Sequence, residues 1–159
     1  MQTSNSNVQA VQNALNTFNL GLTIRVLPDT TRTAQEAADA LGCTINQIAK
    51  SIVFEGRESA NPYLVIACGG KRIDPTILSR ILGELVRLAS PTFVLNTTGY
   101  PVGGVPPLGH TNSIASYIDR DLYKHQHIWA AGGSTHAVFE LSPQDLLTIT
   151  NGTTVSLVE

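Results

Sequence analysis

Residues 33–54, TAQEAADALGCTINQIAKSIVF, place a helix, a tight turn and a strand in one short run, and this order decides the fold class. Thr33 and Glu36 have the spacing of a capping box, in which each side chain bonds the backbone of the other residue. The alanine-rich stretch behind them favours a helix, and Gly42 is the residue type that most often ends one. A helix is therefore predicted between Thr33 and Gly42.

A strand follows this helix almost at once. Thr44 and Gln47 repeat the capping-box spacing and open a short turn that ends near Lys50. The segment SIVFE, residues 51–55, then has the β-branched and aromatic residues of a strand, and PYLVIACGG, residues 62–70, is its expected hairpin partner. These two segments form the first pair of the predicted sheet.

The rest of the chain mixes short strands with short helices. Apolar residues at helical spacing mark the helices, and short β-branched runs mark the strands. The predicted elements are a helix over 8–18, a strand over 22–28, a helix over 73–90, a helix from 91 to about 97, strands over 113–119, 127–132 and 137–141, a helix over 142–147 and a strand over 154–158. Strands that outnumber long helices and run consecutively favour the α+β class. We expect a distorted mixed β-barrel or curled sheet surrounded by helices, as a single domain over residues 1–159.

The composition indicates a hydrophobic core and little charge. Of 159 residues, 42% are hydrophobic and 14% are charged, and the formal net charge is -2. This charge provides no general attraction to phosphates, so a nucleic-acid partner must be held locally. Cys43 and Cys68 lie far apart in apolar settings, which favours two buried thiols in a reducing compartment. Neither a signal peptide nor an apolar run of membrane-spanning length is seen, so we expect a cytoplasmic protein without membrane association.

Lys50 is the first residue for which the sequence suggests chemistry. In the alternation of a strand it shares a face with Ile52 and Phe54, while Ser51 faces the other side. If Ile52 and Phe54 face the core, the Lys50 ammonium points inward at the rim of a pocket. The alternative is a lysine at a strand end that extends its ammonium into solvent, which is the usual situation of lysine.

The segment GYPVGGVPPLGH, residues 99–110, is the second candidate, with four glycines and three prolines. Glycines let a ligand approach the backbone closely, and prolines reduce the entropy that a loop loses when it is ordered. Together they predict a stiff loop whose N–H groups bind an anion or stabilise a developing oxyanion. The alternative is a tight connection that only packs against the sheet.

The segment AGGSTHAVFEL, residues 131–141, is the third candidate. Two glycines precede the hydroxyl groups of Ser134 and Thr135, and His136 follows them at the start of a predicted strand. This arrangement suits a small polar pocket wall. The alternative is an ordinary glycine turn, in which serine and threonine are favoured for local reasons.

The histidines and cysteines do not form a recognised motif. His125 and His127 make an HxH pair that His110 and His136 could join, but no carboxylate cluster supports them and the cysteines lack ligand spacing. Neither cysteine lies in a setting that activates a thiol. We therefore expect no metal ion.

Taken in order, three segments of the chain resemble one known family. TAQEAADALGCTINQIAKSIVF, TGYPVGGVPPLGH and AGGSTHAVFELSPQDL resemble the YbaK/ProX family of free-standing aminoacyl-tRNA deacylases, which are related to the editing domain of bacterial prolyl-tRNA synthetase. The resemblance extends from about Thr33 to Leu146 and so covers most of the chain. It implies a distorted mixed β-barrel with helices around it. It also implies hydrolysis of mischarged aminoacyl-tRNA, chiefly of prolyl-tRNA that carries a wrong small amino acid.

The same resemblance implies partners and cofactors. The expected partner is the acceptor end of an aminoacylated tRNA, with prolyl-tRNA synthetase as a further partner, and neither a metal nor an organic cofactor is implied. The chain departs from better-known members at His110 and in the STHAVF stretch, residues 134–139. Its substrate therefore stays open among alanine, cysteine, serine, threonine and 2-aminobutyrate.

The resemblance also assigns roles to individual residues. Lys50 matches the lysine with which the family opens its strand, residues 103–107 match its GxxxP loop, and residues 132–134 match its third motif. For catalysis we expect the Lys50 ammonium to hold the terminal adenosine or polarise the ester carbonyl, and the amides of Gly103 and Gly104 to stabilise the oxyanion. The expected substrate-binding residues are Ser51, Pro107, His110, Gly133, Ser134 and His136. On the family's pattern, Ile24, Val26 and residues 28–31 also line the pocket.

Two other functions stay open at this point. One is a non-catalytic adaptor of the same fold that binds tRNA or a synthetase, and the other is an unrelated hydrolase that uses the histidines. Lys50 together with an intact GxxxP loop argues against the adaptor, because binding alone does not need both. Stoichiometric zinc in the purified protein would favour the histidine hydrolase.

Overall fold

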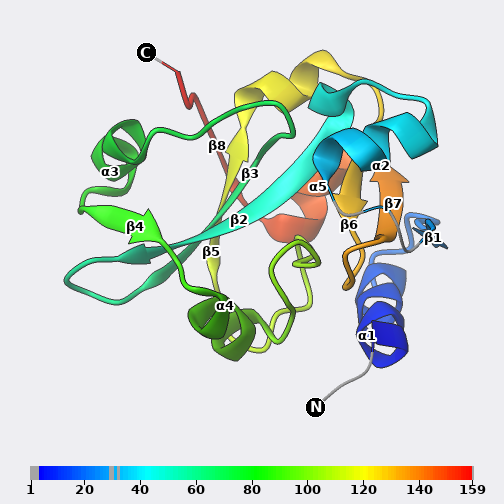
Figure 1. Cartoon of the computed structure of the whole chain (residues 1–159), viewed down its shortest axis with the longest axis horizontal. Coiled ribbons are helices and arrows are strands. Elements are labelled where there is room, and N and C mark those ends of the chain that lie inside the picture. Colours follow the sequence, from blue (N-terminus) through cyan, green and yellow to red (C-terminus); the bar gives the residue numbers. More distant parts are fainter. Residues whose placement is uncertain (1–3, 29–30, 32, 159) are drawn as a thin grey trace.

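The computed structural model describes residues 4–28, 31 and 33–158, and its elements follow the expected mixture of helices and strands (Figure 1). In chain order they are α1 (Ser4–Asn16), β1 (Ile24–Val26), α2 (Ala34–Leu41), the 3-10 helix η1 (Ile45–Gln47), β2 (Ile48–Gly56), β3 (Pro62–Cys68), α3 (Pro75–Leu82), β4 (Val86–Leu88), α4 (Pro91–Thr98), β5 (Ala115–Asp119), the 3-10 helix η2 (Arg120–Lys124), β6 (Ile128–Ala131), β7 (Ala137–Leu141), α5 (Pro143–Thr150) and β8 (Thr153–Val155). The predicted α+β class is confirmed.

One mixed sheet connects all the strands of the described residues. Its order is β1-β7-β6-β2-β3-β5-β8, and β4 pairs with β2 beside this path. The β2–β6, β3–β5 and β5–β8 pairs are parallel, whereas the others are antiparallel. Because β1 and β8 stand at opposite ends of the order, the sheet is curled and open, as the prediction of a curled mixed sheet allowed.

β2 is the strand around which the site is built, because two different strands pair with the two ends of one of its edges and leave the middle unpaired among the described residues. β6 pairs with its first two residues and β4 pairs with residues 54–56. Between them, residues 50–53 have no strand partner on this edge within the described chain; we call this opening the gap. The Val53 carbonyl accepts a hydrogen bond from the Ala89 N–H at 3.0 Å, so the Val53 backbone points to this edge. The Ser51 backbone, two residues earlier, points the same way.

Local sequence signals set the helix ends. The capping box of Thr33 and Glu36 starts α2, and Gly42 ends it in the left-handed conformation, as predicted. Each of α3, α4 and α5 begins with a capping side chain followed by proline, which suits the first turn because that turn needs no N–H donor there. The three caps are Asp74, Ser90 and Ser142.

The predicted helix over 73–90 is wrong beyond Leu82. Gly83 has φ +80°, which ends α3, and the chain then enters β4 and pairs with β2. Leu85, which lies within that predicted helix, is 66% exposed. The predicted strand over 22–28 is shorter than expected and spans only β1.

Three hydrophobic clusters hold the helices to the sheet. The largest joins α1, α4 and α5 to the sheet and also contains Tyr100, Val105 and Leu108 of the glycine-proline segment. α3 covers a second cluster around Phe54 and Leu78, and α2 covers a third. In Figure 1, β2 runs across the molecule from α2 at one end to β4 at the other. The glycine-proline loop is therefore anchored in the core beside the gap.

None of the helices among the described residues is both long and apolar enough to cross a membrane.

Candidate functional site

A small cavity lies where the gap in the sheet faces the glycine-proline loop. It has a volume of about 170 Å³ and is lined by residues of α2, β2, β6 and β7 together with Gly103 and Val105; we call it the central pocket. Its lining is mostly small and apolar, and Lys50 is the single charged residue among the described residues that line it. The alanines that contribute are Ala34, Ala37, Ala49, Ala130, Ala131 and Ala137. The central pocket thus suits a small uncharged group.

Lys50 lies between the central pocket and a second cavity. Its Nζ donates a hydrogen bond to the Lys71 carbonyl at 2.6 Å. Burial lowers the pKa of the Lys50 ammonium, and the nearby charge of Arg72 lowers it further. The predicted shared face with Ile52 and Phe54 is present, since all three line the second cavity, of about 420 Å³. Lys50 is, however, the third residue of β2 rather than the first.

The amides of Gly103 and Gly104, which were expected to act together, differ in whether the N–H group is already hydrogen-bonded. Gly103 has φ +88° and lines the central pocket, and its N–H has no acceptor among the described residues. The Gly104 N–H donates to the Pro101 carbonyl at 3.0 Å and is therefore occupied. A Cβ at Gly104 would lie 2.9 Å from the Ser134 backbone, so glycine permits this close approach of two segments. The second and third motifs are thus brought together.

Pro107 and His110 shape the loop and lie outside the lining of the central pocket. Pro107 is buried. The His110 Nε2 lies 2.6 Å from the Pro106 carbonyl oxygen, to which it donates when neutral. Burial lowers the pKa of His110, and the hydrogen bond to Pro106 offsets only part of this effect. His110 therefore braces the loop from within.

In the third motif, Thr135 rather than its neighbours lines the central pocket. Gly133, with φ +106°, packs against the Asn7 backbone of α1, and Ser134 is buried at 6% exposure behind Gly104. His136 points its Nδ1 at the Thr135 hydroxyl, 3.1 Å away. Gly133, Ser134 and His136 thus support the pocket wall from behind.

Sequence reasoning missed most of the pocket lining, including Thr33, which was identified only as a helix cap, and Trp129, which was identified only as part of a strand. Thr135 was expected beside Ser134 in a polar pocket wall, and it lines the central pocket. The pairing of β6 with β2 brings Trp129 to the site from about 80 positions away, and no local pattern signals it. Of the residues expected on the family's pattern, Val26 is 66% exposed, and residues 29 and 30 lie outside the described chain.

Ser51 faces the central pocket and also a third cavity. That cavity, the apolar pocket, has a volume of about 200 Å³ and is lined by Leu88, Pro91, Val102 and further apolar residues. The Ser51 Oγ is a buried atom without a hydrogen-bond partner among the described residues. Since its backbone N–H also points into the gap, Ser51 has two polar groups available to a ligand.

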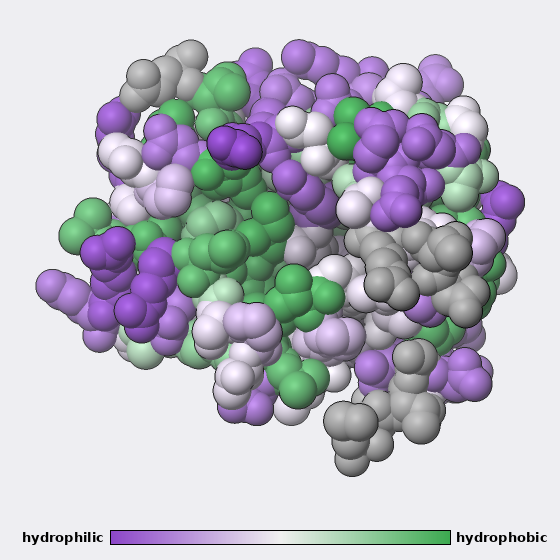
Figure 2. Space-filling view, in the orientation of Figure 1, coloured by the Kyte–Doolittle hydropathy of each residue, from purple (hydrophilic) through white to green (hydrophobic). Residues whose placement is uncertain are grey.

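Hydrophobic surface surrounds the mouth of the apolar pocket. Figure 2 shows it between α3 and α4, over β2 and β4. Leu88 is 67% exposed and Val102 is 56% exposed, and Leu85 and Leu95 are also exposed. Exposed apolar area beside a polar pocket commonly marks a binding surface.

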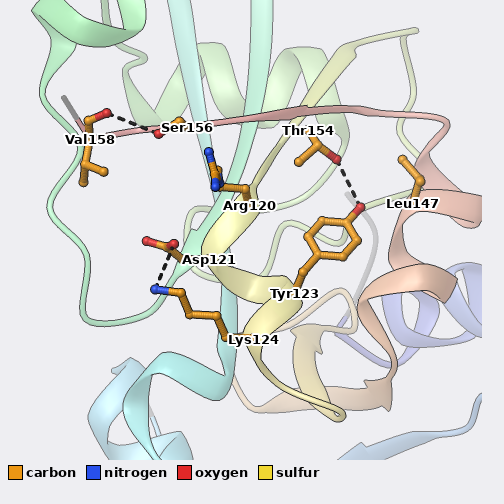
Figure 3. A pocket seen from close by; sticks show the side chains of 8 residues that line it. All are labelled: Arg120, Asp121, Tyr123, Lys124, Leu147, Thr154, Ser156 and Val158. Carbon is orange, nitrogen blue, oxygen red and sulfur yellow. Dashed lines mark hydrogen bonds and ion pairs between the residues drawn. The ribbon is translucent and has the colours of Figure 1, made fainter.

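A separate groove lies between η2 and β8 (Figure 3). Its volume is about 780 Å³, and it shares no lining residue with the central pocket. Several of its polar groups already have partners within the groove. Asp121 pairs with Lys124 at 3.2 Å, and Tyr123 bonds Thr154 at 3.1 Å. We therefore place the candidate site at the central pocket.

The described residues bring no three His, Cys, Asp or Glu side chains together in a way that could hold a metal ion. Burial raises the pKa of Cys68 to about 11, and burial also raises the pKa of Cys43. Neither thiol is thereby prepared to act as a nucleophile.

The fold is that of tRNA-editing proteins. A solved structure described as "a putative trans-editing enzyme for prolyl tRNA synthetase" superposes on the whole chain with a TM-score of 0.91 at 39% identity, covering 99% of that structure. The sequence pattern of the family described as "Aminoacyl-tRNA editing domain" matches residues 28–149, and the chain belongs to this family. The resemblance to YbaK-type deacylases is thereby confirmed.

Curated relatives agree with this membership. "Uncharacterized protein YwhH" of Bacillus subtilis is 35% identical over 114 residues, 72% of each chain. "Putative Cys-tRNA(Pro)/Cys-tRNA(Cys) deacylase EbsC" of Enterococcus faecalis is 27% identical over 120 residues, 75% of this chain and 73% of the relative. A proline–tRNA ligase of Thermosipho melanesiensis is 33% identical over 103 residues, which is 64% of this chain and 18% of the ligase.

Proposed function

We propose that this protein hydrolyses the ester bond of misacylated tRNA, with the aminoacyl group in the central pocket and Lys50 at its rim. Family membership supports the reaction class, and relatives named as a deacylase and a trans-editing enzyme support it further. The single observation that carries the site assignment is that Lys50, Ser51 and Gly103 line one small cavity. The expected substrate is prolyl-tRNA that carries a wrong small amino acid.

In this reaction water adds to the ester carbonyl carbon and forms a tetrahedral oxyanion. The ribose oxygen then leaves with a proton, which gives a free amino acid and a tRNA with a free terminal hydroxyl group. The Gly103 N–H is available to the oxyanion, and the Ser51 N–H faces the gap as a second donor in place of the occupied Gly104 amide. One such donor contributes roughly 3 kcal/mol to the stability of a transition state.

Lys50 supplies positive charge in the ordinary protonated form of its ammonium group. Its ammonium is held by the Lys71 carbonyl at the boundary of two cavities, where a ligand carbonyl or phosphate oxygen can replace or share that contact. Charge-assisted hydrogen bonds of this kind are stronger than neutral ones. Lys50 therefore orients the ester and favours charge that develops on it.

The size and lining of the central pocket support a small uncharged side chain. A cavity of about 170 Å³ walled by alanines admits little beyond a few carbon atoms next to the ester. Discrimination by size is worth only about 1–3 kcal/mol per methylene group, so a separate editing pocket is useful to a synthetase that misacylates. The adjoining apolar pocket suits the base of the terminal adenosine.

The test is ester hydrolysis of tRNA(Pro) charged with alanine, cysteine, serine, threonine or 2-aminobutyrate, with prolyl-tRNA(Pro) as the correct substrate. We expect at least one small amino acid to be released well above the buffer rate, and proline to be retained. Lys50→Ala lowers the rate by about 100-fold, the size expected for loss of a charge-stabilising donor. Lys124→Ala is the matched control, because that lysine side chain is 75% exposed in the separate groove.

Two outcomes would overturn different parts of the proposal. If no charged tRNA loses its amino acid faster than in buffer, the hydrolase assignment is wrong. If Lys50→Ala is as fast as the parent protein, the activity stands but the site is misplaced.

An adaptor of the same fold is the second candidate, because two polar groups of the site already have intramolecular partners. The Lys50 ammonium bonds the Lys71 carbonyl, and the Gly104 amide bonds the Pro101 carbonyl. Binding of tRNA or of prolyl-tRNA synthetase without ester loss in the same assay would favour the adaptor.

A further inference from the structure

The basic residues of the chain are concentrated in one part of the sequence. Six of the ten lysines and arginines lie within residues 50–87, against four of the twelve acidic residues. This segment contains β3 and α3 together with most of β2 and β4, so the positive charge gathers on the elements next to Lys50 in the chain. The net charge of the whole chain, -2, conceals this asymmetry.

The cavity of about 420 Å³ beside Lys50 concentrates this charge. Lys50, Lys71 and Arg72 line it, and the described chain contributes no carboxylate to its lining; we call it the cationic pocket. The two other large hollows are mixed in charge. The groove of Figure 3 contains Asp121, and the hollow along α3 contains Glu84.

Arg72 is the cation in this pocket that has no competing partner. Lys71 is neutralised by Asp119 at 2.8 Å and Asp121 at 2.6 Å. Arg72 is exposed and makes no hydrogen bond or ion pair with any residue of the described chain. Its charge also disfavours the ammonium of Lys50, as the lowered pKa of Lys50 reflects. Two cations that repel one another across a cavity are stabilised by an anion between them.

The cationic pocket adjoins the other two pockets of the site. Lys50 lines both the central and the cationic pocket, and Ile52 and Leu88 line both the apolar and the cationic pocket. Pro75 then joins the cationic pocket to the hollow along α3, where Arg57 and Arg80 lie. A chain that begins at the ester can therefore follow a continuous path from the central pocket to α3.

We propose that the cationic pocket binds a backbone phosphate of the RNA 3′ strand through Lys50 and Arg72, so that the acceptor strand leaves the site across α3 toward Arg57. This inference rests on the proposed function, which places the 3′-terminal ester in the central pocket. An RNA phosphate fits better than an acidic peptide because the path starts at the pocket that takes the ester. Phosphate contacts fix position and orientation on the nucleic acid without reading its sequence.

The test uses an RNA hairpin with a single-stranded CCA end that carries no amino acid. Its binding to the protein is measured by fluorescence anisotropy at a series of salt concentrations. Arg72→Ala weakens binding several-fold and lowers the slope of log K against log salt by about 1, as expected for the loss of one phosphate contact. Arg72→Lys restores part of the lost affinity and part of the lost salt slope. Arg120→Ala, which removes an exposed arginine from the separate groove, is the matched control and leaves both quantities unchanged.

An unchanged slope in Arg72→Ala overturns the proposal and would make an acidic protein surface the partner of this face. Hydrolysis provides the second arm. Arg72→Ala slows ester loss from aminoacyl-tRNA more than from 3′-O-aminoacyl-adenosine, which has no phosphate. Equal slowing of both substrates would also overturn the proposal. Absence of hydrolysis of either substrate by the parent protein would overturn the proposed function, while the RNA-binding arm would still decide the role of Arg72.

Discussion

His110 shows how a single side chain can stiffen the loop that lines the central pocket. Its ring lies within the glycine-proline segment and contacts the Pro106 carbonyl at 2.6 Å, while Tyr100 bonds the Gly109 carbonyl at 3.1 Å. These two contacts close the loop from within, so its amides keep their directions without strand pairing. His110 does not line the central pocket, and its expected role in substrate binding stays a prediction.

The pH dependence of stability should report this contact. Burial lowers the pKa of His110 below its ordinary value of 6.5, so the folded protein disfavours the protonated ring. Its contribution to stability is present above pH 6.5 and is lost as the pH falls through the lowered pKa. From about pH 7.5 to about pH 5 the parent protein should lose more unfolding free energy than His110→Gln, which keeps a donor but does not titrate. Equal losses in urea titrations would contradict this account.

At the scale of elements, the gap in the sheet explains which parts of the site the sequence could predict. Helix caps are local, so the ends of α2 and the start of α5 followed from Thr33, Glu36 and Ser142. The true start of β2 did not, because β6 pairs with it in parallel from a distant part of the chain. A parallel partner leaves no turn signal next to the strand that it extends.

The same reason explains the helix that was predicted too long. Residues 83–90 have apolar spacing that fits a helix, but β2 offers an open edge that residues 86–88 complete. Pairing that depends on tertiary context overrode the local pattern. Likewise, Thr135 lines the central pocket because Gly104 packs against the backbone of Ser134, a contact between segments that no single motif contains.

Thr33 both caps α2 and lines the central pocket. A comparison with Ser142, which caps α5 only, can separate these two roles. Thr33→Ala removes the bond from the Glu36 N–H, at 3.1 Å, and Ser142→Ala removes the equivalent bond from the Asp145 N–H, at 3.0 Å. Each should lower the free energy of unfolding by about 1 kcal/mol. Only Thr33→Ala should also slow deacylation, because Thr33 lines the central pocket and Ser142 does not. Equal deacylation rates for the two variants would show that Thr33 contributes to stability as a cap but not to the site.

At the scale of the whole molecule, a buried ionic network connects the site to the core. Lys71 bonds Asp119 of β5 and Asp121 of η2, and the Cys68 N–H donates to Asp119 at 3.2 Å. Burial of Lys71 acts to lower its pKa, but the hydrogen bonds and charges of the two carboxylates together outweigh burial and raise the pKa. The carbonyl of the same residue holds the Lys50 ammonium, so the network fixes the position of the catalytic candidate.

Loss of the Lys71 charge should therefore affect stability and activity together. Asp119 is fully buried, and Lys71→Met leaves its carboxylate without a counter-charge, which costs about 3–5 kcal/mol of unfolding free energy. The double variant Lys71→Met with Asp119→Asn should regain much of this loss, because asparagine keeps an acceptor and carries no charge. Chemical denaturation of the single and double variants measures both values. No recovery in the double variant would indicate that packing, rather than charge, dominates.

The gap has one more consequence, for the behaviour of the protein in a crowded solution. An unpaired stretch of strand is a template on which a second chain can add, and natural proteins protect such edges. Here Val102, Gly103 and Val105 of the glycine-proline loop stand against residues 50–53 and occupy this edge without pairing as a strand. The loop that lines both pockets thus also keeps another copy of the chain from pairing with this strand edge.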